Sequence, residues 1–424
     1  MRTDHVTLTP AQVRGFWAAW LGWTLDGMDS FIFALVLAPA LTELLPRSGL
    51  DGSPSHVAFA GSVLFAVFLA GWGSSLIWGP LADRWGRTRT LAASVACYAL
   101  FTGAAALSQN VWQLGVFRFF AGVGIGGEWA LAGTYVAEVW PESRRKMGAG
   151  YLQTGYYAGF FIAAALNFTV GASYGWRVMF LCGGAPVLLA LYMLSKLREP
   201  DRWMKAAERA PARAPMWEIF RGAYRRRTLV NAALVTISII GLWAGAVYEP
   251  SAIIHLAKTA GYDARAAVRF ASFGTGLLSI GTCLGCIAVP PLAERIGRRA
   301  TLALFFAGMA ICIWECFGWA FYAPRNALGL FVGSLFFLGF FGGNFAIYSL
   351  WLPEQYSTAV RATAFAFVTS FGRFIGAGVN FLIGAGVHAY GSMGIPVAAT
   401  AVAFVLGLVV LPFGQETRGA PLPD

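Results

Sequence analysis

The sequence predicts an all-α membrane protein in which twelve transmembrane helices form two six-helix halves. The first observation is composition: of 424 residues, 58% are hydrophobic and 12% are charged, whereas soluble domains contain about 25% charged residues. The second is a series of apolar runs that are long enough to cross a bilayer. The third is a motif that occurs once in each half of the chain. Together these observations exclude a soluble globular domain.

Twelve apolar runs approach the length of about 20 residues that a helix needs to cross the hydrocarbon core. They lie near residues 15–39, 57–78, 90–107, 111–137, 148–170, 177–195, 228–255, 268–289, 300–320, 328–350, 362–386 and 394–412. A polar stretch separates the sixth run from the seventh. We therefore expect an N-terminal half (1–195), a cytoplasmic linker (196–227) and a C-terminal half (228–424).

Positive charge marks one side of the membrane. If the polar N-terminal segment is a cytoplasmic tail, most of the 31 Lys and Arg residues fall in cytoplasmic loops, above all in the linker. This is the bias that the positive-inside rule describes. We expect a multi-pass protein of the inner membrane, surrounded by lipid, with both termini in the cytoplasm. The same loops account for the net charge of +11 without a nucleic-acid partner.

The two halves carry the same motif in the same order. The stretch "GPLADRWGRTRTL" (79–91) follows the second span, and "PPLAERIGRRATL" (290–302) follows the eighth. Further along, Gly126-Gly127, Glu138 and Arg145 correspond to Gly342-Gly343, Glu354 and Arg361 at nearly the same offset. Parallel repeats of this kind are typical of transporters whose site lies between two halves.

These stretches resemble the major facilitator superfamily (MFS). The loop 79–91 resembles the signature between helices 2 and 3 of that superfamily, and "FRFFAGVGIGGEWALAGTYVAEVWPESRR" resembles its helix 4. Within the superfamily, "AAWLGWTLDGMDSFIFALVL" is similar to helix 1 of sialate:proton symporters, and its D-G-x-D core to aromatic acid:proton symporters. "GGEWALAGTYVAE" is similar to the sialate and metabolite:proton branches. The resemblance implies a proton-coupled transporter.

The repeated loop motif is expected to hold the halves together at the cytoplasmic side. Asp83 would face the arginines that follow it, and the two glycines of the motif permit tight backbone. Charge-assisted hydrogen bonds would latch the halves in an outward-open state; the alternative is that the charged loop only sets topology. We expect Glu138 with Arg145, and their counterparts Glu354 with Arg361, to join the same latches. The candidate gating residues are Gly79, Asp83, Arg84, Gly86, Arg87, Glu138, Arg145, Glu294, Arg298, Glu354 and Arg361.

Five ionisable side chains lie well inside the predicted spans: Asp26, Asp29, Arg118, Glu128 and Arg373. A charge at the bilayer centre costs about 3 kcal/mol, so these groups must face one another or a hydrated cavity. Asp26 and Asp29 share one helix face, and Arg118 is expected to lie close to one of them. Two carboxylates beside one arginine do not both stay ionised easily, which predicts a proton carrier. We favour Asp29 slightly over Asp26, and Glu128 becomes the leading candidate if neither aspartate carries the proton; a purely structural salt bridge is the alternative.

Arg373 is the candidate for binding the substrate. An arginine in this setting on helix 11 of aromatic acid symporters implies a carboxylate ligand, whose two oxygens suit the planar guanidinium. Asn380 lies seven residues further on, on the same helix face. Other side chains that could complete the site are Gln153, Tyr156, Tyr157, Asn344, Tyr348 and Trp243. Glu249, His255 and Glu315 are weaker candidates for coupling.

No motif points to catalysis, a cofactor or a metal. A G-x-G-x-x-G at Gly122, Gly124 and Gly127 lies within a span. Close helix packing explains it better, because a dinucleotide fold needs a strand before the motif. The sequence contains no Walker A motif, no metal-ligand cluster and no nucleophile beside a base. An enzyme is therefore not expected.

The sequence thus predicts a secondary transporter, functional as a monomer, that imports an organic acid anion with a proton by alternating access. The acid would be a monocarboxylate, a sialate-like acid or an aromatic acid. One alternative is a neutral-sugar or drug carrier of the same fold. The other is a non-transporting membrane sensor, although the longest polar stretch is too short for a signalling domain.

Overall fold

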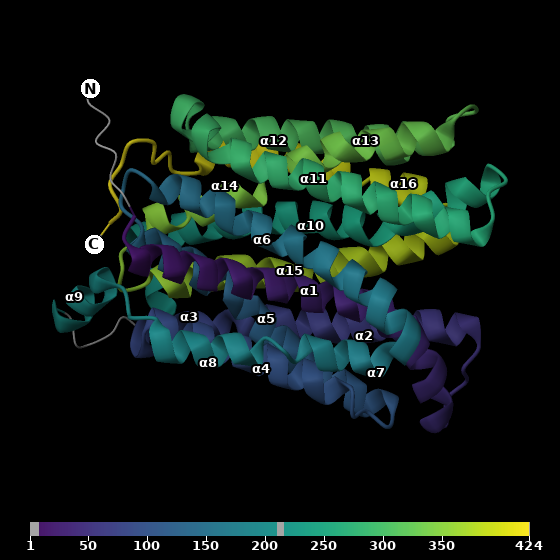
Figure 1. Cartoon of the computed structure of the whole chain (residues 1–424). Coiled ribbons are helices and arrows are strands. Elements are labelled where there is room, and N and C mark those ends of the chain that lie inside the picture. The colour runs from purple at the N-terminus through teal and green to yellow at the C-terminus, as the bar shows by residue number, and fades with distance from the viewer. Residues whose placement is uncertain (1–7, 210–215, 424) are drawn as a thin grey trace.

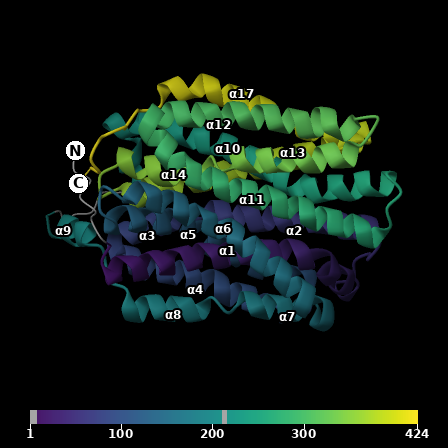
Figure 2. The ribbon, with the colours of Figure 1, turned by 45° about the horizontal axis from the view of Figure 1, so that its top comes forward.

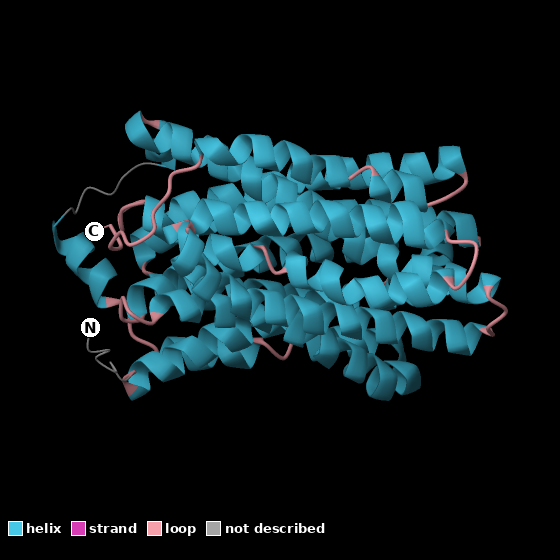
Figure 3. Ribbon diagram, turned by 90° about the horizontal axis from the view of Figure 1, so that it is seen from above, coloured by secondary structure: helices cyan, strands magenta, loops and turns pink. Residues whose placement is uncertain are grey.

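The computed structural model describes residues 8–209 and 216–423. Within this part of the chain, helices and connecting loops account for the whole fold, and no strand occurs (Figure 3). The prediction of an all-α protein is confirmed.

The N-terminal helices form six rods. They are α1 (Pro10–Arg47), α2 (Pro54–Ser74), α3 (Trp78–Trp85), α4 (Arg87–Ala105), α5 (Val111–Val139), α6 (Arg145–Leu166), α7 (Ala172–Gly183) and α8 (Val187–Lys196). A 3₁₀ turn at Ser75–Ile77 joins α2 to α3, and α7 and α8 together make the sixth rod. A π-helical turn at Asn167–Gly171 extends α6.

The C-terminal helices form six more rods after the short helix α9 (Asp201–Arg209). They are α10 (Gly222–Thr259), α11 (Ala264–Ile296), α12 (Arg298–Ile313), α13 (Ala327–Gly342), α14 (Phe345–Trp351), α15 (Arg361–Tyr390), α16 (Gly394–Ala398) and α17 (Ala401–Val410). The helices α13 and α14 follow one another in a single rod, as do α16 and α17. Among the described residues, nine rods are long and apolar enough by themselves to cross a membrane. The other three contain α4, α6 and α10.

Several spans begin at a side-chain cap. At the start of α1, the Thr9 hydroxyl accepts from the backbone of Gln12, whose amide oxygen in turn accepts from Thr9. Asn110 caps α5 and Asp263 caps α11 in the same way, through bonds to Gln113 and Ala266. These caps satisfy backbone N–H groups that have no partner within the helix, and they place the helix starts outside the apolar layer.

The rods run roughly parallel, and α1, α6 and α15 lie in the middle of the bundle (Figure 1). The start of α1 and the end of the chain lie at the same end of the bundle, near α9 (Figures 1 and 2). We call this end the termini side. The helices that follow α9 gather on one side of the bundle, and the earlier helices on the other.

Glycines set the closest approach between α1 and α6. A Cβ atom on Gly159 would lie 2.0 Å from the carbonyl oxygen of Thr24, and one on Gly27 would lie 2.1 Å from that of Tyr156. Small residues at such contacts let two membrane helices pack backbone to backbone. This close packing fixes the position of the α1 face that carries the acidic residues.

We predict that Gly159→Ala destabilises the protein, because its methyl group would collide with backbone that cannot rotate away. Overpacking of this kind costs about 1–3 kcal/mol, which should lower the midpoint of thermal unfolding in detergent. The matched control is Gly276→Ala in α11, where an added Cβ meets nothing within 4 Å. Alanine is the better helix former, so this control should not lose stability. Equal midpoints for the two variants would show that the α1–α6 contact is not tightly packed.

Candidate functional site

Arg118 and Asp29 form a buried ion pair in the N-terminal half. Nη1 of Arg118 lies 3.2 Å from Oδ1 of Asp29, and Nη2 lies 3.3 Å from Oδ2. Arg118 also donates to the Thr102 hydroxyl at 3.0 Å, and its guanidinium lies 4.4 Å from the ring centre of Phe33. The predicted proximity of Arg118 to an α1 carboxylate is confirmed. Because the pair is bidentate, both oxygens of Asp29 are occupied by Arg118.

Asp26 and Glu128 are buried and lack such a partner. Neither carboxylate has a hydrogen bond among the described residues. Glu128 of α5 reaches over α1, where a Cβ on Gly22 would lie 2.2 Å from its Oε1. Asp26 is close enough to interact electrostatically with Glu128, Asp29 and Arg373. Since burial of an unpaired carboxylate is costly, this site tolerates the neutral, protonated form best.

Arg373 projects from α15 of the C-terminal half toward the N-terminal half. Its guanidinium lies 4.1 Å from the ring centre of Trp72, an arrangement that favours a cation. Nη1 donates to the carbonyl of Thr369 on its own helix, and Nε has no hydrogen-bond partner in the described part of the chain. The side chain is buried. It therefore has donor capacity left for a ligand.

A layer of aromatic rings closes the middle of the bundle. Trp23 stacks on Tyr156 with ring centres 4.8 Å apart, and Trp129 lies 5.6 Å from Phe345 of the other half. The indole N–H of Trp129 donates to the Ser349 hydroxyl at 2.9 Å. Sequence reasoning missed Trp129. The signal available was a tryptophan in the middle of a span, where its N–H must find an acceptor.

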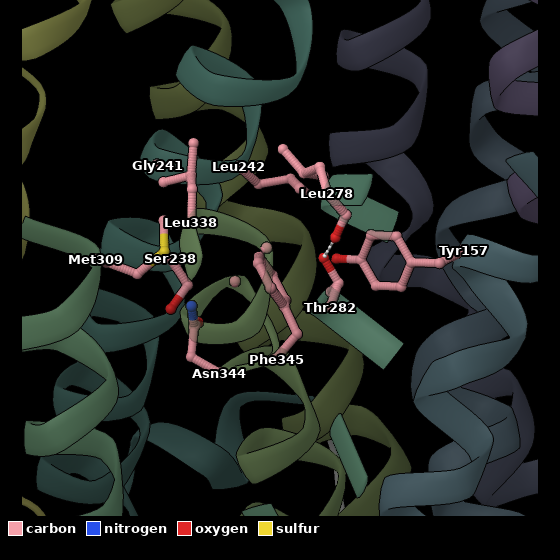
Figure 4. A pocket seen from close by; sticks show the side chains of 12 residues that line it. Tyr157, Ser238, Gly241, Leu242, Leu278, Thr282, Met309, Leu338, Asn344 and Phe345 are labelled. Carbon is pink, nitrogen blue, oxygen red and sulfur yellow. Dashed lines mark hydrogen bonds between the residues drawn. The ribbon is translucent and has the colours of Figure 1, made fainter. Parts of the chain in front are cut away.

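A small cavity lies between α6 and the C-terminal half (Figure 4). Tyr157 enters from α6, while Ser238, Thr282 and Asn344 come from the other half. The rest of the wall is apolar, with Leu242, Leu278, Met309, Leu338 and Phe345 among its members. The volume is about 30 Å³, which is enough to hold an ordered water molecule. Of the cavity's polar residues, Tyr157 and Asn344 were predicted site residues, and Ser238 and Thr282 were not.

The remaining predicted substrate residues are scattered. Tyr348 is bonded within the C-terminal half, because its hydroxyl donates to the carbonyl of Leu234 at 2.9 Å. Gln153 is buried with its Oε1 unpartnered, and neither side-chain polar atom of Asn380 has a partner among the described residues. None of these three lines the cavity. The side chain of Trp243 lies outside the described part of the structure.

Two clusters of buried charge join the halves at the termini side. Glu138 binds Arg87 through two hydrogen bonds of 3.1 Å and Arg361 through one of 2.7 Å. It does not pair with Arg145, which instead lies 3.4 Å from Glu354. All four residues thus take part in the contacts between the halves, and each glutamate faces an arginine of the opposite repeat.

The second cluster repeats the first. Arg298 donates to Glu354 at 3.0 and 2.8 Å, as Arg87 does to Glu138. Glu294 binds Arg298 at 2.6 Å and also Lys146 of the other half at 2.6 Å. The positions that correspond in sequence therefore make corresponding contacts, and ion pairs cross between the halves in both clusters.

Asp83 completes the first cluster. It binds Arg87 at 2.6 Å, and its other oxygen accepts from the backbone N–H of Thr363 at 2.9 Å. Gly79 allows this approach, since an added Cβ would lie 2.6 Å from the Ala362 carbonyl oxygen. Arg84 is exposed, so the structure does not place it in the cluster as predicted.

Each repeat also has a glutamate cap that the sequence did not reveal. Gly86 has φ 114° and Gly297 has φ 92°, a region that favours glycine. After each glycine, a helix begins whose N–H groups donate to a distant carboxylate, that of Glu199 for α4 and that of Glu416 for α12. The carboxylates lie at the positive ends of the helices, where they are stabilising.

The last feature of the site to consider is whether its side chains could bind a metal ion. Among the described residues, no group of three or more His, Cys, Asp or Glu side chains could hold an ion.

Comparison with known proteins identifies relatives over the whole chain. The profile of the Major Facilitator Superfamily matches residues 19–380. A protein of Cupriavidus pinatubonensis named "Probable 4-methylmuconolactone transporter" is 31% identical over 98% of this chain and 93% of that protein. The 4-hydroxybenzoate transporter of Pseudomonas aeruginosa is 28% identical, with 95% of this chain and 94% of that protein covered. Among solved structures, an MFS proton:xylose symporter bound to 6-bromo-6-deoxy-D-glucose is similar in fold, with a TM-score of 0.79 at 18% identity over 97% and 98% of the two chains.

We predict that Glu138→Gln strongly destabilises the structure, because Arg87 and Arg361 would lose their shared buried carboxylate. Breaking a buried pair costs about 3–5 kcal/mol, to be measured as a fall in the thermal unfolding midpoint in detergent. Glu354→Gln should do the same in the second cluster. The control is Glu142→Gln, which breaks a half-exposed pair with Arg145 worth at most about 1 kcal/mol. If Glu138→Gln is no more harmful than this control, the buried clusters do not hold the halves together.

Proposed function

The chain belongs to the major facilitator superfamily, and on that premise we propose that it imports an organic acid anion together with a proton by alternating access. The substrate carboxylate binds Arg373, and Asp26 and Glu128 carry the proton. The relatives described above are named as transporters, and our proposal includes no enzymatic step.

The main observation behind this proposal is that Arg373, a buried arginine between the halves, forms no ion pair with a carboxylate among the described residues. Arg373 is held by the ring of Trp72 and by one carbonyl of its own helix, and its Nε is free of protein partners among the described residues. An anionic substrate supplies the missing charge and two acceptors in the geometry that a guanidinium favours. A neutral sugar would leave this cation unbalanced.

Coupling follows from the position of Asp26. In the absence of substrate, the positive charge of Arg373 lies within electrostatic range of Asp26 and opposes the cost of ionising that buried carboxyl, so Asp26 can release its proton. A bound carboxylate takes over Arg373 and adds a negative charge nearby, which favours protonation of Asp26. Binding of the anion and binding of the proton thus assist each other, and by linkage the assistance is mutual.

The pairing of Asp29 changes our preference among the acidic residues. Its two oxygens accept hydrogen bonds from Arg118, whereas those of Asp26 and Glu128 have no hydrogen-bond partner in the described part of the chain. A group that carries a proton has to lose and gain charge in each cycle. Asp26 and Glu128 suit that role better than Asp29, whose deprotonated form keeps Arg118 neutralised.

The location of the contacts between the halves supports an outward-facing state. The ion pairs and hydrogen bonds that cross between the halves lie between the aromatic layer and the termini side. There the two charge clusters would block the path of a substrate. We propose that this side is cytoplasmic, because most of the chain's basic residues lie there, and that the protein resides in the inner membrane. The halves enclose one site, so we expect the monomer to be the functional unit.

We predict that purified protein in liposomes accumulates labelled organic acids when the lumen is alkaline, and that a protonophore abolishes the accumulation. The screen contains short monocarboxylates, hydroxybenzoates, sialic acid and, as the neutral alternative, xylose. Arg373→Lys keeps the charge but loses the planar fork, so the acid should bind more weakly by about 1–3 kcal/mol. Accumulation that persists with protonophore and follows a sodium gradient would contradict proton coupling, and transport of xylose but no acid would contradict the substrate class.

We predict that Asp26→Asn and Glu128→Gln abolish proton-driven accumulation while exchange of labelled for unlabelled acid continues. A neutral amide mimics the protonated state, and exchange requires no deprotonation. Asp29→Asn is the comparison: it leaves Arg118 without its carboxylate, so it should lower the thermal midpoint, and Asp26→Asn should not. If Asp26→Asn and Glu128→Gln both still concentrate the acid, these two carboxylates are structural.

A further inference from the structure

Three of the polar side chains that line the cavity of Figure 4, those of Asn344, Ser238 and Thr282, have oxygen lone pairs available to accept hydrogen bonds. Asn344 is buried, and its Nδ2 donates to the carbonyl of Phe341 at 2.9 Å. This bond fixes which end of the amide is the nitrogen, and the opposite atom, Oδ1, has no partner among the described residues. Asn344 therefore offers the cavity a free acceptor.

Ser238 and Thr282 offer acceptors as well. The Tyr348 hydroxyl has a single hydrogen, which goes to the Leu234 carbonyl, so Ser238 must be the donor in its 2.9 Å bond to Tyr348. Thr282 donates its own hydrogen to the carbonyl of Leu278 at 2.9 Å. The lone pairs of both hydroxyl oxygens remain available. Tyr157, on the facing wall, can either donate or accept.

The size of the cavity restricts what can enter it. A volume of about 30 Å³ is far below the roughly 300–1,000 Å³ of sites that enclose a whole small-molecule ligand, so the cavity admits a small polar group and not a whole acid. The surrounding wall is apolar, and its Phe345 ring belongs to the aromatic layer through Trp129. The cavity is therefore suited to a small polar end of a ligand whose larger apolar part lies against the aromatic rings.

Two adjacent tyrosines of α6 connect the cavity with Asp26 and Arg373. Tyr157 lines the cavity, and its neighbour Tyr156 is close enough to Asp26 and Arg373 to interact with them electrostatically. The two tyrosine rings are 5.6 Å apart. A ligand with its carboxylate on Arg373 would thus have its remote end near the cavity.

We propose that this cavity is a subsite that accepts hydrogen bonds, and that it selects organic acids with a hydroxyl or N–H donor at the end remote from the carboxylate. The inference rests on the proposed function, because it concerns the same bound acid. An acid without that donor leaves the buried Oδ1 of Asn344 unsatisfied and displaces the water that would otherwise bond to it, which lowers its affinity.

The test compares ligands that differ only in the donor. Binding of benzoate, 4-fluorobenzoate, 4-hydroxybenzoate and 4-aminobenzoate, with the 3-substituted isomers, is measured on purified wild-type protein by isothermal titration calorimetry. Fluorine is close to a hydroxyl in size but has no hydrogen to donate. We expect the hydroxy and amino acids to bind about tenfold more tightly than the fluoro acid, as one well-made hydrogen bond provides.

Two variants assign the preference to the cavity. Asn344→Leu removes the acceptor at similar volume, and the ratio of hydroxy to fluoro affinity should fall from about tenfold to about twofold. Thr282→Val is isosteric and leaves the backbone unchanged, so it serves if the leucine variant does not fold; it should lower the same ratio. A monodisperse elution profile and a thermal midpoint near that of the wild type establish folding for each.

The outcomes separate the two proposals. Equal wild-type affinity for hydroxy and fluoro acids, or a ratio unchanged in both variants, overturns the subsite. If no benzoate binds but the liposome screen finds another acid without a remote donor, the subsite is also overturned, and the proposed function stands. If no acid in the screen is bound or transported, the proposed function itself is wrong.

Discussion

Charge buried inside an apolar bundle has to be balanced, and the Arg118–Asp29 pair balances only part of it. The pair is bidentate and lies against three aromatic rings, and among the described residues Asp26, Glu128 and Arg373 form no such ion pair. In a membrane, unmatched groups of this kind are retained where function needs them. In the proposed coupling, a substrate carboxylate binds Arg373 and favours protonation of Asp26. This coupling requires that neither residue is already held in an ion pair.

The charge clusters at the termini side follow from the repeat. Glu138 and Glu354 occupy corresponding positions, and each bridges the arginine of its own half to an arginine of the other. Removal of either carboxylate would expose two buried cations to each other. Opening this side therefore requires both clusters to separate together, which suits an alternation between two states better than a gradual opening.

The spans, the repeat and the buried ionisable residues could be predicted from the sequence, because apolar length and charge are properties of the chain itself. The ion-pair partners could not be predicted in this way. Glu138 binds Arg361 and not Arg145 because the two repeats face each other across the bundle. Ser238 and Thr282 were missed for another reason. A hydroxyl on an apolar helix usually bonds to its own or a neighbouring backbone, so only the cavity shows that its lone pairs are available.

The central claim, that a neutral carboxyl is kept at the centre of the bundle, can be tested by infrared difference spectroscopy on the purified protein at neutral pH. The account predicts a C=O stretch of a buried carboxylic acid in the wild type. This band should be lost in the double variant Asp26→Asn/Glu128→Gln and retained in Asp29→Asn. A wild-type spectrum without the band, or a band that survives in the double variant, would contradict the account.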